Sequence, residues 1–337
     1  MLFSDPMMRL LAAAVAGALL LPVRGQGAEV AGWVANGAVF VLFLMNGMKI
    51  ARREVLAGFR NWRFLVPLCL WVFGAMALAG LGLARLALGV LPASLALGFL
   101  FLGTLTSTVQ SATSYSSLAG GNAALSVVSA ALLNILGVFV TVPLFLALGG
   151  PVAGDGGGET ILRIVLLLLV PFAIGQAVQS RTATFVARHR GAIAWLDRLV
   201  IATAVYVAFS GAVSQGIGSR VGGSDWVWLT VLTGAFIAFA HGGAWTASAL
   251  LRLPRRDRIA FLFAGAQKSV AVGAPLATLI FSSADAGFVV MPLLLYHLLT
   301  LVVAAPLATL LASAHPRDDD GCSAPTTTAT ARSGSPR

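Results

Sequence analysis

Apolar runs of about 20 residues recur along almost the whole chain, and they constrain its fold more than any other feature. A helix needs about 20 apolar residues to cross the hydrocarbon core of a bilayer. Only 10% of the 337 residues are charged and the mean hydropathy is +0.91, whereas soluble domains carry roughly 25% charged residues. We therefore expect an all-α polytopic membrane protein whose main partner is the lipid bilayer of the cell (plasma or inner) membrane.

The apolar runs predict ten transmembrane helices. The predicted ranges are 7–23, 29–48, 64–86, 92–119, 123–148, 161–179, 195–216, 226–251, 259–281 and 287–312. The first range is interpreted as a retained helix. A cleaved signal peptide is the alternative, because Arg9 precedes its apolar run.

Basic residues gather in the loops after the second, sixth and eighth predicted spans. These three loops hold 13 of the 22 basic residues, namely Lys49, Arg52, Arg53, Arg60, Arg63, Arg181, Arg188, Arg190, Arg198, Arg252, Arg255, Arg256 and Arg258. Loops rich in Lys and Arg stay on the cytoplasmic side. This distribution predicts that both termini are cytoplasmic, and it explains the net charge of +10 without a nucleic-acid partner.

Five spans in each half give the two halves opposite orientations, so the sequence predicts an inverted repeat. We expect a first five-helix repeat over 1–149, an external linker over 150–160 and a second repeat over 161–312. The remaining residues, 313–337, are rich in Asp, Thr, Ser and Pro, which predicts a disordered cytoplasmic tail. The sequence does not predict an oligomeric state.

Two of the predicted spans carry polar residues at their centres. In the fourth span, Thr104 to Ser117 is dominated by hydroxyl and amide side chains, and in the ninth span Lys268 lies between Gln267 and Ser269. Lys268 follows Arg258 by ten residues, which places it about 15 Å along the helix. A lysine at that depth costs several kcal/mol if it faces lipid. Matching interrupted spans in two halves indicate the midplane site of a transporter.

These two spans supply most of the candidate substrate- or ion-binding residues. They are Ser107, Thr108, Gln110, Ser111, Thr113, Ser114, Asn134, Gln267, Lys268 and Ser269. Any single serine or threonine could instead serve only in helix packing, and Lys268 could be a structural lysine paired with a carbonyl or carboxylate. The lone His241 and His297 are expected to be core residues. No metal-ligand cluster, nucleotide-binding loop or catalytic pair is evident, so we expect neither an enzyme nor a cofactor.

Three segments carry a recognisable pattern, namely 43–63 (FLMNGMKIARREVLAGFRNWR), 92–150 with its GGN turn, and 263–281 (FAGAQKSVAVGAPLATLIF). They resemble the bile acid:sodium symporter superfamily, and in particular its SBF-like subgroup, which is related to the orphan seventh member of solute carrier family 10. The resemblance implies a panel domain and a core domain. It also implies that broken spans four and nine cross near the midplane, with sodium and substrate bound beside the crossing.

The chain departs from the pattern of sodium-coupled members at two positions. Phe263 stands where they carry an acidic residue, and Lys268 stands where they carry an asparagine. We hypothesise that the Lys268 ammonium replaces a sodium ion, which makes sodium coupling doubtful and leaves proton coupling open. The alternative is that Lys268 pairs with an anionic group of the substrate.

The sequence thus favours a secondary active transporter of an organic anion or small amphipathic solute that works by alternating access. The alternative is a membrane regulator or sensor that keeps the transport fold without appreciable transport. We expect Lys268→Ala to abolish or reshape function while leaving folding largely intact.

Overall fold

The computed structural model describes residues 6–49, 61–151 and 158–314. Within these ranges every regular element is a helix. The predicted tail from 315 onward, most of the predicted linker, and Arg52, Arg53 and Arg60 of the first basic loop lie outside the described residues.

Each of the ten predicted ranges coincides with one helix or with consecutive helices. The helices are α1 (Pro6–Leu20), α2 (Gln26–Lys49), α4 (Trp62–Cys69), the π-helical segment η2 (Leu70–Ala75), α5 (Met76–Ala87), α6 (Ala93–Thr104), α7 (Val109–Leu118), α8 (Ala123–Ala147), α9 (Gly158–Arg188), α10 (Arg190–Ser214), α11 (Ile217–Arg220), α12 (Gly223–Leu250), α13 (Arg255–Ala266), α14 (Val270–Ile280) and α15 (Ala286–Ser313).

Seven stretches of the described chain are long and apolar enough to cross a membrane, and the bent pair α6–α7 makes an eighth if it counts as one span. The helix α1 is apolar but shorter, with 15 residues. The chain is therefore a multi-pass membrane protein. Apolar side chains such as Trp33, Leu78 and Val227 are more than half exposed, as expected for surfaces that face lipid.

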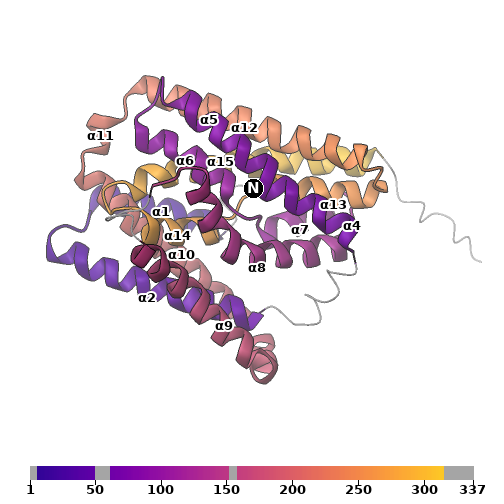
Figure 1. Ribbon diagram of the computed structural model, residues 1–337, viewed down its shortest axis with the longest axis horizontal. Coiled ribbons are helices and arrows are strands. Elements are labelled where there is room, and N and C mark those ends of the chain that lie inside the picture. Colours follow the sequence, from indigo (N-terminus) through magenta and orange to yellow (C-terminus); the bar gives the residue numbers. More distant parts are fainter. Residues whose placement is uncertain (1–5, 50–60, 152–157, 315–337) are drawn as a thin grey trace, which may run out of the picture.

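The helices form two groups that lie on opposite sides of the molecule (Figure 1). In one group α2 packs along α9, and α1 packs against α10. In the other, α5 packs on α6, α6 on α15, and α12 on α13. The helix α14 lies between the groups, since it contacts α10, α2 and α15.

Small residues allow the closest helix pairs to approach backbone to backbone. A Cβ atom on Gly47 of α2 would lie 2.3 Å from the carbonyl oxygen of Phe172 in α9. Similarly, a Cβ atom on Gly103 of α6 would lie 2.7 Å from the carbonyl oxygen of Met76 in α5. Association of helices in lipid depends on such close packing, so these glycines fix the α2–α9 and α5–α6 contacts.

Candidate functional site

The first interruption of a span separates α6 from α7 at residues 105–108, and the two helices are bent by 64°. Leu105 and Thr108 have extended backbone conformations. A helix that ends inside the protein leaves carbonyl groups without partners in its last turn. At membrane depth those groups need partners from other segments.

Lys268 supplies partners to the last turn of α6. Its ammonium nitrogen donates to the carbonyl oxygens of Gly103 at 2.9 Å, Leu105 at 2.6 Å and Val72 at 3.3 Å. The residue is only 1% exposed. An ammonium group has three donors, and here each donor has one carbonyl acceptor. The negative end of the α6 dipole also favours a cation at this place.

The rest of the first interruption is held by hydrogen bonds to α8 and to the second interruption. The backbone NH of Ser269 donates to the Thr106 carbonyl at 2.9 Å. The Asn134 amide donates to the Ser107 carbonyl at 3.1 Å, and the Thr106 hydroxyl donates to the Leu133 carbonyl at 2.8 Å. The two interruptions therefore lie against each other, and Asn134 fixes the first of them to α8.

The second interruption, residues 267–269 between α13 and α14, is as deeply buried as residues 105–107 of the first. Ser269 caps α14 by accepting from the backbone NH of Val272 at 3.2 Å. The Tyr296 hydroxyl donates to the Ala266 carbonyl at 2.6 Å. Gln267 accepts a hydrogen bond from the Ser111 hydroxyl of α7 at 3.1 Å. Side chains from α7 and α15 thus support this interruption.

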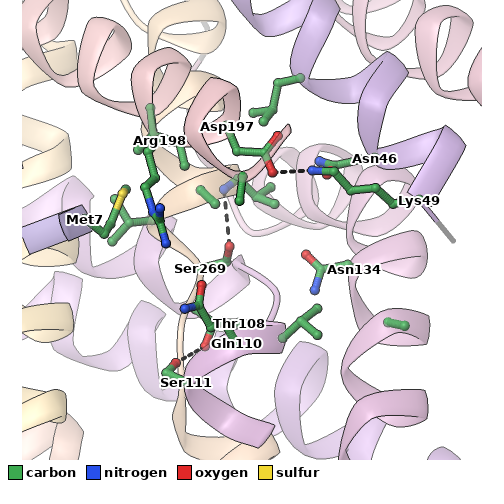
Figure 2. Close-up of a pocket in the computed structure, with 18 of the residues that line it drawn as sticks. Met7, Asn46, Lys49, Thr108, Gln110, Ser111, Asn134, Asp197, Arg198 and Ser269 are labelled. Atoms are coloured by element: carbon green, nitrogen blue, oxygen red, sulfur yellow. Dashed lines mark hydrogen bonds and ion pairs between the residues drawn. The ribbon is translucent and has the colours of Figure 1, made fainter. Parts of the chain in front are cut away.

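A cavity of about 600 Å³ lies beside the two interruptions, between the two groups of helices (Figure 2). Its walls come from α1, α2, α7, α8, α9, α10, α14 and α15. Apolar side chains such as Leu42, Val138 and Phe172 line much of it. Ligand sites have volumes of roughly 300–1,000 Å³ and are mostly apolar, with a few polar groups, so this cavity has the size and character of a ligand site.

Six of the ten residues predicted from the sequence line this cavity. They are Thr108, Gln110, Ser111, Ser114, Asn134 and Ser269. The other four, Ser107, Thr113, Gln267 and Lys268, are not among its lining residues. The hydroxyls of Ser107 and Thr113 are buried and have no hydrogen-bond partner among the described residues.

Several cavity residues were not predicted from the sequence. Lys49 at the end of α2 and Arg198 in the first half of α10 were interpreted only as basic residues that orient the protein, yet both line the cavity. Asp197 and Asn46 also line it, and His297 does so rather than lying in the core. The one available signal for Asn46, Lys49, Asp197 and Arg198 was their position near the ends of apolar runs.

The described residues contain no group of three or more His, Cys, Asp or Glu side chains that could hold a metal ion. Oxygen atoms suited to a monovalent cation are instead the carbonyls of Val72, Gly103 and Leu105, which already accept from Lys268. The site therefore presents amides, hydroxyls and the charged side chains of Lys49, Asp197 and Arg198 to the cavity, and it keeps the Lys268 ammonium beneath them.

Known proteins resemble this chain over most of its length. An uncharacterized protein of Pseudomonas aeruginosa, PA2026, is 36% identical over 316 residues, which cover 93% of this chain and 94% of the relative. A protein of Escherichia coli named putative symporter YfeH is 34% identical over 305 residues, covering 90% and 92%. The sodium/bile acid cotransporter 7 of Danio rerio is 23% identical over 270 residues, covering 77% and 78%.

The sequence pattern of one protein family matches nearly the entire chain. The SBF-like CPA transporter family matches residues 5–313, which include both interruptions and every helix that lines the cavity. The resemblance that the sequence motifs indicated is thereby confirmed, and the chain belongs to the SBF-like CPA transporter family.

Proposed function

We propose that this chain is a secondary active transporter that moves an organic anion or a small amphipathic solute by alternating access. It belongs to a family of transporters rather than enzymes, and its Escherichia coli relative is named as a symporter. The observation that carries the proposal is the cavity beside the two interrupted spans, with the Lys268 ammonium held between those spans.

The proposed topology has ten spans, with α1 and α9 added to the eight stretches that pass by length and composition. Residues 1–149 and 161–312 form two inverted repeats joined by an external linker over 150–160. Both termini are cytoplasmic, because the basic loops lie on that side. In this scheme α1, α2, α9 and α10 form a panel domain, and the other long helices form a core domain.

The cavity is proposed to face the cytoplasm. Both Lys49 at the end of α2 and Arg198 in the first half of α10 line it, and the predicted topology places these parts of the two helices toward the cytoplasmic side. At the opposite end α10 contacts the segment before α15 so closely that a Cβ atom on Gly211 would lie 1.7 Å from the Ser283 carbonyl oxygen. This tight contact supports an external side that is closed in the conformation described.

The ammonium of Lys268 is proposed to take the place of a coupling cation. Rings of carbonyl oxygens can replace the hydration shell of a monovalent cation, and three such oxygens surround this nitrogen. A tethered cation cannot dissociate with the substrate, so transport would not depend on sodium at this position. Lys268 has no donor left for a substrate anion in this conformation, and this favours the replacement over direct pairing with substrate.

Uptake into proteoliposomes tests the transport proposal. A panel of radiolabelled organic anions would be offered to the purified protein in liposomes, with protein-free liposomes as the control. We expect uptake of at least one anion, at equal rates in sodium and potassium buffers. Uptake that requires sodium would contradict the proposed role of Lys268.

The alternative function is a membrane regulator or sensor that binds a solute without moving it. The feature that favours this alternative is the lysine at position 268, where sodium-coupled members carry an asparagine. Its tethered ammonium occupies the carbonyl oxygens that a mobile coupling cation would use. A panel anion that raises the thermal unfolding temperature of the protein, yet is never taken up, would support the regulator and overturn the transporter.

A further inference from the structure

We propose that Arg198 selects a singly charged anion in this cavity, and that the Lys49–Asp197 ion pair keeps Arg198 available to do so. The inference rests on the proposed function, because it assumes that the cavity is the substrate site. It adds the charge of the substrate and the residue that recognises it.

Among the residues that the structure describes, three charged side chains line the cavity, and two of them neutralise each other. Lys49 at the end of α2 forms an ion pair with Asp197 of α10. Both partners are about one-quarter exposed, at 26% and 24%, so solvent screens the pair only in part. The third charged side chain is Arg198, the next residue along α10.

Arg198 points away from its neighbour Asp197. Figure 2 shows Asp197 turned toward Lys49, whereas the Arg198 guanidinium lies on the side of Met7 and Gln110. Among the described residues Arg198 forms no ion pair with a carboxylate, and its guanidinium carbon lies 5.3 Å from the centroid of the Trp195 ring. The cavity lining therefore carries one uncompensated positive charge.

The pairing of Asp197 with Lys49 is what leaves that charge uncompensated. If Lys49 were absent, Asp197 would be the nearest carboxylate in sequence to Arg198 and could neutralise it. With Lys49 present, the carboxylate is held toward α2. The three residues thus set the net charge of the cavity to that of a single cation.

The ligand that fits is an amphipathic monoanion. A guanidinium binds carboxylate, sulfonate or phosphate oxygens through two parallel hydrogen bonds. The apolar walls suit a hydrocarbon body, and the amides of Gln110 and Asn134 can meet neutral polar groups on it. A dianion would leave one of its charges without a partner.

Modification of a cysteine in the cavity measures this charge without knowledge of the substrate. Ser114 lines the cavity and is exposed, so Ser114→Cys would be made in a background with Cys69→Ser and Cys322→Ser. Everted membrane vesicles would be treated with two methanethiosulfonates of opposite charge, the ethylsulfonate and the ethyltrimethylammonium. The ratio of their rates, normalised to a free thiol, reports the sign of the local potential.

We expect the anionic reagent to react faster, and Arg198→Gln to lower the rate ratio about tenfold, since charged clefts change local ion concentrations by 10-fold or more. Arg198→Lys should preserve the ratio. Lys49→Met should lower it, because Asp197 is then free to neutralise Arg198, and Asp197→Asn should raise it. Arg190→Gln is the matched control, since Arg190 is exposed, lies on the same helix and does not line the cavity.

The outcomes separate this inference from the proposed function. A rate ratio that Arg198→Gln leaves unchanged, or that Arg190→Gln lowers equally, would show that Arg198 only helps to orient the protein and would overturn the inference alone. Failure of both reagents to reach Ser114→Cys from the cytoplasmic face would overturn the cytoplasm-facing cavity and the inference with it.

Discussion

The two interrupted spans differ in shape, burial and role, although both break near their centres. The first bends by 64°, and its second half, α7, carries Gln110 and Ser114, which are exposed and line the cavity. The second remains one span from Arg255 to Ile280, with 94% of its apolar window buried. The first span therefore exposes α7 to the cavity, whereas the second contributes Ser269 and the first turn of α14 to the cavity wall and is otherwise enclosed by protein.

The second interruption stabilises the first. Lys268 extends from the second interruption to the carbonyls of Gly103 and Leu105 in the first, and the Ser269 NH donates to Thr106. A break that faces a water-filled cavity can have part of its backbone hydrated. The carbonyls on its buried side cannot be hydrated, so they depend on a donor from the neighbouring span. The comparison indicates that a charge at membrane depth can serve first to complete a broken helix.

Loss of the Lys268 ammonium should have the largest effect on this arrangement. Lys268→Ala leaves three buried carbonyls without their donor, and a buried acceptor left unsatisfied costs about 1–3 kcal/mol. We expect a loss of at least that size in the free energy of unfolding, which corrects our expectation from sequence that folding stays largely intact. Lys268→Met, which keeps an apolar stem, should be destabilised similarly, and wild-type stability in either variant would contradict the structural role of the ammonium.

A methyl group forced against the first interruption should have a smaller effect. A Cβ atom on Gly137 of α8 would lie 2.7 Å from Cβ of Thr106, and added atoms in a packed interior typically cost about 1–3 kcal/mol. Gly137→Ala should therefore lower the thermal unfolding temperature. Gly234→Ala in α12 is the matched control, since nothing lies within 4 Å of its added atom. An equal response of the two variants would show that the packing of Gly137 against Thr106 is not needed.

The hydrogen bond between Ser111 and Gln267 should contribute least to the contact between the interruptions. Ser111→Ala removes this 3.1 Å bond together with the hydrogen bond between the Ser111 and Thr108 hydroxyls, and a neutral hydrogen bond contributes about 1 kcal/mol. Ser117→Ala, at an exposed position on the same helix, should change stability by less than about 0.5 kcal/mol. Thermal unfolding of both variants in nanodiscs would measure the difference. A loss of stability in Ser111→Ala no larger than that in Ser117→Ala would show that this bond does not stabilise the contact between the interruptions.

Much of the fold follows from sequence patterns because long apolar runs permit few structures. The predicted ranges coincide with helices, and the two polar segments predicted the positions of both interruptions. The ten-span count remains a proposal, since α1 has only 15 residues. The inverted repeat remains a proposal as well.

The candidate site was predicted less completely than the fold, because side-chain direction depends on packing between distant elements. Gln267 and Lys268 are adjacent to Ser269, yet only Ser269 lines the cavity. The pattern of basic residues predicted loops, whereas the structure places most of the described ones, Arg198 among them, inside helices, and the pattern could not show that Arg198 points inward. That direction depends on how α10 is rotated against α2 and α14.

The most direct test of the proposed cation replacement is the thermal stability of the purified wild-type protein in sodium and in potassium at equal ionic strength. A ligand that binds only the folded state stabilises it by mass action. We predict equal unfolding temperatures in the two salts, because the Lys268 ammonium already occupies the carbonyl oxygens that a cation would use. A gain in stability specific to sodium would show that a sodium site persists beside the lysine, and would contradict the replacement.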